Sequence, residues 1–302
     1  MKKVLGVSLG SSTRDHKVVI EALGEKVEVE RRGTDGDVKK MEQIFEEYDG
    51  KVDVFGLGGT DLYLYSGPKG KRYTIKESEK IVRVIKKTPL VDGTGIKYIL
   101  EKNVVKYVAT HTDIVFKGKR ALVPITVDRF GLAEGLMEEG CEMTFGDLIF
   151  SLHIPIPLHS FKSIEILARL LLPILAYVPI KYLYPTGKKQ EEVNLKYVKY
   201  FQDSDIIGGD YLVISQYMPP TLPGKIIITN TVTPSNVEEL KRRGLSYLIT
   251  TTPELEGRSF GTNVFQAILV AVSGKAPEEL EPNDYLELIE KIGFKPRIEK
   301  LN

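Results

Sequence analysis

Short apolar runs alternate with amphipathic stretches along most of the chain. Runs such as Val4–Leu9, Val52–Phe55 and Ala121–Ile125 predict buried strands, and the apolar residues between Gly33 and Gly50 recur at helical spacing. This order of strand, turn and helix is typical of a parallel α/β sheet. Further strands are expected at His16–Leu23, Lys26–Arg31, Pro89–Val91, Glu142–Phe145, Ile206–Ile214, Lys225–Thr229 and Tyr247–Ile249. Further helices are expected at Glu77–Lys87, Gly95–Val108, Ser235–Arg243 and Phe260–Val272.

The predicted elements fall into two lobes and a tail. Each lobe is expected to hold a mostly parallel sheet flanked by helices, and the second lobe to be Rossmann-like. We place an N-terminal α/β domain with a β-hairpin at residues 1–115. A Rossmann-like α/β domain with an apolar helical insertion is expected at 116–275, and a C-terminal docking helix at 276–302.

The most apolar segment, Ile164–Leu183, is interpreted as a buried or lid helix. It contains Arg169, Lys181, Pro173 and Pro179, which a lone membrane span tolerates poorly. The apolar run at the N-terminus is short and leads directly into polar residues, so it predicts a first strand rather than a signal peptide. No membrane partner is therefore expected.

Composition and charge narrow the class of protein. Of the 302 residues, 42% are hydrophobic and 27% are charged, as in a globular protein with a filled core. The formal net charge is +1, which favours neither nucleic acid nor an anionic membrane as the main partner. The single cysteine, Cys141, excludes an intramolecular disulfide, and a cytoplasmic setting is expected.

Two turns of the first lobe are candidate substrate contacts. One contains Gly58, Gly59, Thr60 and Asp61 directly after a buried strand, and the other begins at Asp92. Glycines let a backbone approach a ligand and present N–H groups to an anion. Asp61 is also a candidate catalytic acid or base. A tight turn with a purely structural role is the alternative.

The TVDRFG segment of the second lobe stands where a dinucleotide fold carries its phosphate loop. Asp128, Arg129 and Gly131 in this segment are candidate cofactor contacts. Asp147 ends the next strand, where an acidic residue would bind a ribose hydroxyl. The alternatives are a loop or capping role for Asp147 and a salt bridge for Arg129.

Two hydroxyl-rich turns follow later strands of the same lobe. One contains Thr231 and Thr233, and the other contains Thr251 and Thr252. Ligands of parallel sheets sit beyond the carboxyl ends of the strands, so these hydroxyls are candidate cofactor contacts. The alternative is that they are β-branched strand ends.

The segment GRSFGTN offers a candidate site for an anionic substrate. Arg258 can hold a carboxylate or phosphate through two hydrogen bonds. Ser259, Gly261, Thr262 and Asn263 then lead into a helix whose first N–H groups also favour an anion. Plain capping by Asn263, with Gly261 permitting a bend, is the alternative.

A lysine loop and the histidines complete the candidate residues. Lys188, in the segment PTGKKQ, is a candidate catalytic acid or base, with a solvated loop lysine as the alternative. The four histidines lack a metal-ligand partner at helical spacing, so no metal is expected.

Several segments together resemble a known group of proteins. These are VSLGSSTRDHKV, GLGGTDLYLY, GCEMTFGDLIF, PTGKKQ, ITNTVTP and TTTPELEGRSFGTN. Over nearly its whole length the chain resembles bacterial proteins catalogued as quinate 5-dehydrogenases. The resemblance implies an oxidoreductase that uses NAD or NADP to oxidise a cyclic hydroxy acid such as quinate or shikimate. Where dehydrogenases of this type carry a catalytic lysine, after the asparagine–threonine turn, this chain has Ser235 and Asn236.

Two other functions are compatible with the same pattern. The opening GVSLGSST, followed by a hairpin, is similar to the phosphate-binding opening of the sugar-kinase, Hsp70 and actin superfamily, which implies an ATP- or phosphate-binding protein. A non-catalytic sensor that closes its lobes on a small anion is the third reading. A small anionic ligand is expected in each case, and a homodimer is the expected assembly where the chain is not a monomer.

Overall fold

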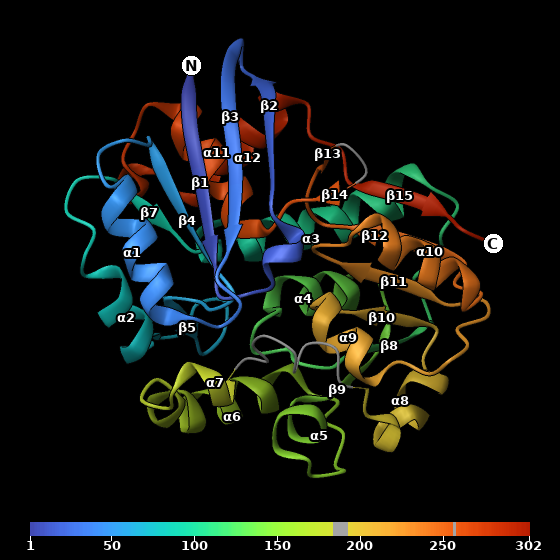
Figure 1. Cartoon of the computed structure of the whole chain (residues 1–302). Coiled ribbons are helices and arrows are strands. Elements are labelled where there is room, and N and C mark those ends of the chain that lie inside the picture. Colours follow the sequence, from blue (N-terminus) through green and yellow to red (C-terminus); the bar gives the residue numbers. More distant parts are fainter. Residues whose placement is uncertain (184–192, 256–257) are drawn as a thin grey trace.

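The first lobe is built on a mostly parallel sheet. The computed structural model describes residues 1–183, 193–255 and 258–302. In these residues the first sheet has the strand order β2-β3-β1-β4-β7, and only β2 runs antiparallel to its neighbour (Figure 1). Its strands are β1 (Lys2–Ser8), β2 (His16–Ala22), β3 (Glu25–Gly33), β4 (Val54–Gly58) and β7 (Leu90–Val91).

The second lobe repeats this design. Its sheet has the order β15-β12-β11-β10-β8-β9, and only the edge strand β15 is antiparallel. The strands are β8 (Arg120–Val123), β9 (Glu142–Phe145), β10 (Ile206–Gly208), β11 (Ile226–Thr229), β12 (Tyr247–Thr250) and β15 (Arg297–Lys300). The expected two-lobed α/β fold with mostly parallel sheets is confirmed.

Alternate residues of the strands pack on opposite faces of each sheet. In β1, Leu5 and Val7 pack with Met41 and Phe45 of one helix, whereas Val4 belongs to the cluster on the other face. The central strands are thus buried on both faces, which explains why they appear in the sequence as continuous apolar runs. The helices of the first lobe are α1 (Val38–Tyr48), α2 (Lys76–Val82), α11 (Thr262–Ser273) and α12 (Pro282–Ile292).

The second sheet is also covered on both faces. Leu122 of β8 and Ile207 of β10 face one apolar cluster, while Ala121 and Ile206 face the other. The remaining helices are α4 (Phe130–Glu138), α5 (Asp147–Leu152), α6 (Phe161–Leu175), α7 (Ile180–Leu183), α8 (Val198–Gln202), α9 (Tyr211–Tyr217) and α10 (Pro234–Arg242). Small hairpins pair β5 (Tyr63–Tyr65) with β6 (Arg72–Thr74) and β13 (Glu254–Leu255) with β14 (Arg258–Ser259). Short 3-10 helices lie at Ser12–Arg14, Leu195–Tyr197 and Pro277–Glu279.

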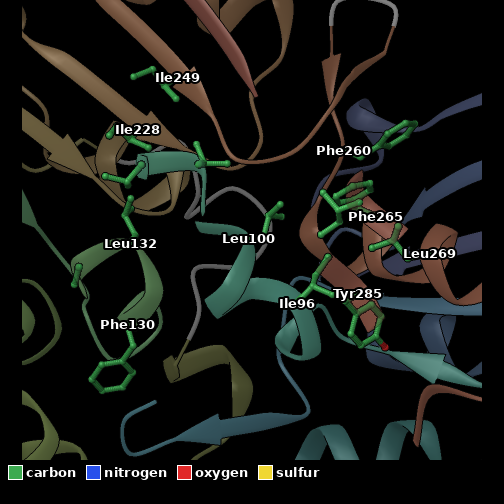
Figure 2. Close-up of a cluster of buried hydrophobic side chains, with 14 of the residues drawn as sticks. Ile96, Leu100, Phe130, Leu132, Ile228, Ile249, Phe260, Phe265, Leu269 and Tyr285 are labelled. Atoms are coloured by element: carbon green, nitrogen blue, oxygen red, sulfur yellow. The ribbon is translucent and has the colours of Figure 1, made fainter. Parts of the chain in front are cut away.

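Helix α3 (Thr94–His111) lies between the lobes. It packs against α4 of the second lobe and against α11 and α12 of the first. In Figure 2, Ile96 and Leu100 of α3 lie between Leu132 of α4 on one side and Phe265 of α11 on the other. One apolar cluster therefore continues from lobe to lobe, with α3 at its centre.

The chain passes between the lobes again near its C-terminus. After β12, α11 packs on β1 and β4 of the first sheet, and the chain then returns to add β15 beside β12. Residues 262–275, placed by the sequence in the second domain, thus pack on the first lobe. The tail docks as a helix and also contributes a strand that its polar sequence, RIEK, did not predict.

Two further predictions need correction. The strand expected at Ile206–Ile214 ends at Gly208, because Gly209 has a φ of 152° and the side chain of Asp210 caps α9. The helix expected at Glu77–Lys87 ends at Val82. For the apolar segment after Phe161, a search of the described residues finds no helix whose length and apolar character would let it span a bilayer.

Candidate functional site

A cavity of about 720 Å³ lies between the two lobes. In each sheet, the strand order reverses at one point, between β1 and β4 and between β8 and β10. Ligands of doubly wound folds bind at such a point, beyond the carboxyl ends of the strands. Ser8 and Gly58 of the first sheet's reversal line the cavity, and so do Pro124 and Asp210 of the second. The cavity therefore lies at the edge of each sheet where doubly wound folds bind their ligands.

The cavity brings together most of the site residues expected from the sequence. Those that line it are Gly58, Gly59, Thr60, Asp61, Asp92, Asp128, Arg129, Asp147, Thr231, Thr233, Ser259, Gly261, Thr262 and Asn263. Gly131, Thr251 and Thr252 are not among the lining residues. Lys188 and the side chain of Arg258 lie outside the described part of the chain, so their expected roles stay predictions.

The three residues that do not line the cavity have packing or hydrogen-bonding roles instead. A Cβ on Gly131 would lie 2.1 Å from the carbonyl oxygen of Tyr98, so this glycine permits the close packing of α4 on α3. The Thr252 hydroxyl donates to the carbonyl of Asn230 at 2.8 Å, and the amide of Thr251 donates to the carbonyl of Thr229 at 2.8 Å. Both threonines thus join the end of β12 to the end of β11.

The loop proposed for phosphate binding is held by the carboxylate of Asp147, at the start of α5. The amides of Thr126 and Val127 donate to Asp147 Oδ1 at 2.9 and 3.0 Å. These amides are therefore already paired, and the Asp147 carboxylate is turned toward its own lobe. Arg129 Nη1 lies 2.5 Å from Glu101, and its Nη2 lies 3.2 Å from Asp210.

A buried ion network crosses the cavity wall. Lys97 Nζ lies 3.3 Å from Asp61 Oδ1 and 2.6 Å from Asp128 Oδ1. Arg129 Nε lies 3.1 Å from the other oxygen of Asp128. Asp210, which Arg129 also contacts, accepts from the Asn230 amide at 3.0 Å. Charged residues at the cavity thus largely neutralise one another.

The network determines which members stay charged. Burial alone would lower the pKa of Lys97, but the carboxylates of Asp128 and Asp61 raise it above its usual value. Burial raises the pKa of Glu101, and the guanidinium of Arg129 opposes that rise. Lys97 therefore stays an ammonium and cannot accept a proton near neutral pH.

Two polar side chains of the cavity retain hydrogen-bonding capacity. Burial raises the pKa of Asp147 to about 6, and its Oδ2 is buried and accepts no hydrogen bond from the described residues. The Asn263 side chain lies at the start of α11 beside Gly58, and no hydrogen bond to its amide is found in the described part of the chain. The Asn263 amide offers a ligand in the cavity a donor and an acceptor, whereas Oδ2 of Asp147 has no exposed surface there.

Sequence reasoning missed several lining residues. His16 and Arg31 are opposite each other on β2 and β3. The alternation of polar and apolar residues in that hairpin did not indicate that its end lines the cavity. The His16 ring stacks on Phe260 with centroids 4.9 Å apart. Lys97 was missed because it lies in the first turns of a helix whose apolar pattern dominated the interpretation. Asp210 was missed because the apolar run around it predicted a strand, whereas it caps α9.

Metal binding has no support in this geometry. Within residues 1–183, 193–255 and 258–302, no group of three or more His, Cys, Asp or Glu is placed to hold an ion. The carboxylates at the cavity are instead occupied by Lys97, Arg129 and backbone amides.

Comparison with solved structures finds several sugar-binding proteins at low identity. A galactofuranose binding protein is 11% identical, with a TM-score of 0.35 over 97% of this chain and 99% of that one. GanP, a glucose-galactose binding protein from Geobacillus stearothermophilus, is 9% identical, with a TM-score of 0.37 over 99% and 97%. A periplasmic ribose ABC transporter structure from Conexibacter woesei is 10% identical, with a TM-score of 0.36 over 96% and 97%. No curated protein matches the sequence.

These findings correct the functional predictions made from the sequence. The structures named above are described as sugar-binding or sugar-transport proteins, and the predictions of a quinate-type dehydrogenase and of an NAD(P)-dependent oxidoreductase are wrong. The ATP-binding and anion-sensor alternatives match no better. One of these structures is described as periplasmic, and the expected cytoplasmic setting is corrected. Binding of NAD or NADP stays a prediction.

Two family models together cover most of the chain. Residues 3–92 match a family described as "Domain of unknown function (DUF8753)". Residues 95–301 match one described as "Domain of unknown function (DUF8754)", and this is more than half of the chain. The two matches meet at Gly93, the residue that caps α3 between the lobes. The chain belongs to the family of domains of unknown function DUF8754.

Proposed function

We propose that the protein binds a small, uncharged, polyhydroxylated molecule of the sugar type between its lobes and releases it unchanged. The observation that supports this most is the internal neutralisation of the cavity. Lys97 and Arg129 are paired with the carboxylates of Asp61, Asp128 and Asp210, while the Asn263 amide remains available for hydrogen bonds. Such a site suits hydroxyl groups, which donate and accept.

The balance of charge favours a neutral ligand over the small anion expected from the sequence. Among the described lining residues, the acidic side chains are Asp61, Asp92, Asp128, Asp147 and Asp210. The basic ones are Arg14, Arg31, Lys97, Arg129 and Lys181. The numbers are equal, and an anion that bound at Arg129 or Lys97 would have to displace a carboxylate. That exchange gains little because a buried cation deprived of its partner is costly.

Release without reaction is supported by the state of the carboxylates. Asp61 and Asp128 are held by Lys97, and Asp92 accepts from the amides of Leu62 and Thr94 at 2.8 and 3.0 Å. General acid–base catalysis needs a group that can reach the substrate with its proton or lone pair. Glycoside hydrolysis needs two such carboxyl groups, and among the described lining residues the only buried carboxylate oxygen without a partner is Oδ2 of Asp147.

A ligand panel tests the proposal directly. Glucose, galactose and ribose represent neutral sugars, and quinate and glucarate represent anions of similar size. We expect at least one neutral sugar to raise the melting temperature in proportion to the logarithm of its concentration, with calorimetry giving the dissociation constant. Stabilisation by the acids alone, or by neither class, contradicts the proposal.

A matched pair of variants locates the binding site. Asn263→Ala removes the amide at the cavity, and we expect the sugar to bind about tenfold to a hundredfold more weakly, since a ligand hydroxyl loses its partner. Asn103→Ala removes an exposed asparagine of α3 that does not line the cavity. Equal affinities in the two variants would place the ligand elsewhere.

The assembly state is a separate proposal that does not depend on the cavity. We keep the homodimer as the expected oligomer, and sedimentation velocity over a hundredfold range of concentration tests it. A single monomer species throughout that range rejects the dimer without bearing on the cavity.

A further inference from the structure

Helix α6 runs from one lobe to the other beside the cavity. Near its start, the ring of Phe161 packs edge-on against Phe130 of the second lobe, with centroids 5.6 Å apart. Beyond its end, the amide of Lys76 in the first lobe donates to the carbonyl of Ala176 at 2.8 Å, and the amide of Ile180 donates to Glu77 at 2.6 Å. The helix is thus fixed to both lobes and forms a wall of the space between them.

Three faces of α6 are apolar and differ in what covers them. The first is buried, although Ala168 and Leu172 in it also line the cavity, the second lines the cavity and is half-buried, and the third is exposed to solvent. In order, these faces are Ile164, Ala168 and Leu172; Leu167, Leu171 and Leu175; and Ile166, Leu170 and Ile174. The second face therefore presents three leucine side chains that the described part of the chain leaves partly uncovered inside the cavity.

Other apolar side chains line the same cavity as this leucine face. Leu64 comes from β5, Phe150 from α5, and Val213 from α9, while Ile125 and Val127 flank the loop after β8. The polar side chains described above come from the strand ends. The cavity thus combines an apolar wall from the α5–α6 insertion with a polar edge from the two sheets.

We propose that the ligand is amphiphilic, with a polyhydroxylated head at the strand ends and a hydrocarbon chain or ring against Leu167, Leu171 and Leu175. The inference rests on the proposed function for the head group and adds a second requirement. A cavity of about 720 Å³ falls in the upper part of the range used for drug-sized ligands. A free monosaccharide at the polar edge would leave the leucines facing water, whereas an attached apolar group would cover them.

A series of alkyl glycosides of increasing alkyl length tests the hydrocarbon tail. Methyl, butyl, hexyl and octyl glycosides of the sugar that binds best in the panel, or of glucose where none does, are titrated below their micelle-forming concentrations. We expect each added methylene to tighten binding by about threefold to fourfold, as for apolar surface transferred out of water. An affinity that does not change with chain length overturns the proposal.

Leu171 and Leu170, which are neighbours in sequence but lie on different faces of α6, provide a matched pair of variants. Leu171→Gln places a polar group on the cavity face, and we expect the dependence on chain length to flatten while the methyl glycoside binds as before. Leu170→Gln alters the exposed face, where the side chain is 67% accessible, and should keep the full dependence. Leu167→Gln serves as a second cavity variant where Leu171→Gln does not fold. Equal flattening in the Leu170 and cavity variants overturns the proposal.

The polyhydroxylated head and the hydrocarbon tail of the proposed ligand can be rejected separately. Where no glycoside binds, the polyhydroxylated head is rejected, and the alkanols from butanol to octanol then test the leucine face alone. Tighter binding of longer alkanols that is lost in Leu171→Gln supports the apolar subsite without the sugar. Binding of free sugars and methyl glycosides with no gain along the series supports the proposed function and rejects the amphiphile.

Discussion

The ammonium nitrogen of Lys97 lies 3.3 Å from Oδ1 of Asp61, and this contact ties the helix between the lobes to the loop after β4. The same nitrogen lies 2.6 Å from Asp128 in the second lobe. One buried cation therefore holds carboxylates from both lobes at the edge of the cavity. The relative position of the lobes depends on side chains that also form the wall of the proposed site.

Replacing Lys97 should destabilise the protein strongly. Lys97→Met takes the buried ammonium away from Asp61 and Asp128, although Asp128 keeps its contact with Arg129, and we expect the free energy of unfolding to fall by about 3–5 kcal/mol in urea titrations. Lys102→Met is the control, because Lys102 pairs with Glu134 and Glu138 where its side chain is 30% exposed. Its loss should be about 1 kcal/mol or less. Similar losses for the two variants would show that the Lys97 network adds little.

The stability of the protein should depend on pH through Asp147. Its pKa is raised from 3.8 to about 6 in the folded state, so between about pH 4 and pH 6 the folded protein binds this proton more tightly than the unfolded chain. The favourable contribution is therefore present below about pH 4 and is lost as the pH rises through about 6. The shift corresponds to roughly 2–3 kcal/mol.

The variant Asp147→Asn isolates this effect from other titrating groups. Its amide oxygen can still accept from Thr126 and Val127, but it has no proton to bind or release in this range. We expect the variant to gain stability relative to the native chain as the pH rises from 4 to 7, measured by urea unfolding at each pH. Parallel pH profiles would mean that Asp147 titrates at its ordinary value.

Most of the fold could be predicted because the central strands are buried on both faces. Runs such as Val4–Leu9 and Ala121–Ile125 appear as continuous apolar segments for that reason. Edge and boundary elements could not be predicted in this way. Strand β15 has a polar sequence and pairs on one side only, and the end of β10 depends on the backbone at Gly209.

The sequence could predict several loops that line the cavity, but not the ion pairs between their side chains. Strand ends in parallel sheets converge, and the turns that contain Gly58 and Thr231 line the cavity, whereas Thr251 and Thr252 do not. The ion pairs join residues far apart in sequence, as when Arg129 meets Asp210 across 81 positions. The NTVTP turn, which supported the resemblance to a dehydrogenase, includes Thr233 and leads into a capping box in which Thr233 and Asn236 bond each other's backbone.

The single cysteine should be inert in the folded protein. Cys141 is 9% exposed, and burial raises the pKa of its thiol to about 12. Only the thiolate reacts with disulfide reagents, so at pH 8 labelling should be slower than in urea by more than a hundredfold. The labelling rate then reports opening of the segment between α4 and β9. A rate equal to that of a free thiol would place Cys141 at an accessible surface.

A methyl group at Gly93 should disturb the junction between the lobes. Gly93 has a φ of 92°, and a Cβ there would lie 2.7 Å from the backbone nitrogen of Asn263 at the start of α11. Gly93→Ala should therefore lower the free energy of unfolding by more than about 2 kcal/mol, because the strained backbone and the contact with α11 add together. The control Gly274→Ala shares a positive φ of 68° but meets nothing within 4 Å, so it should cost about 1 kcal/mol. Urea unfolding of both variants measures the difference, and equal costs would show that α11 moves aside without penalty.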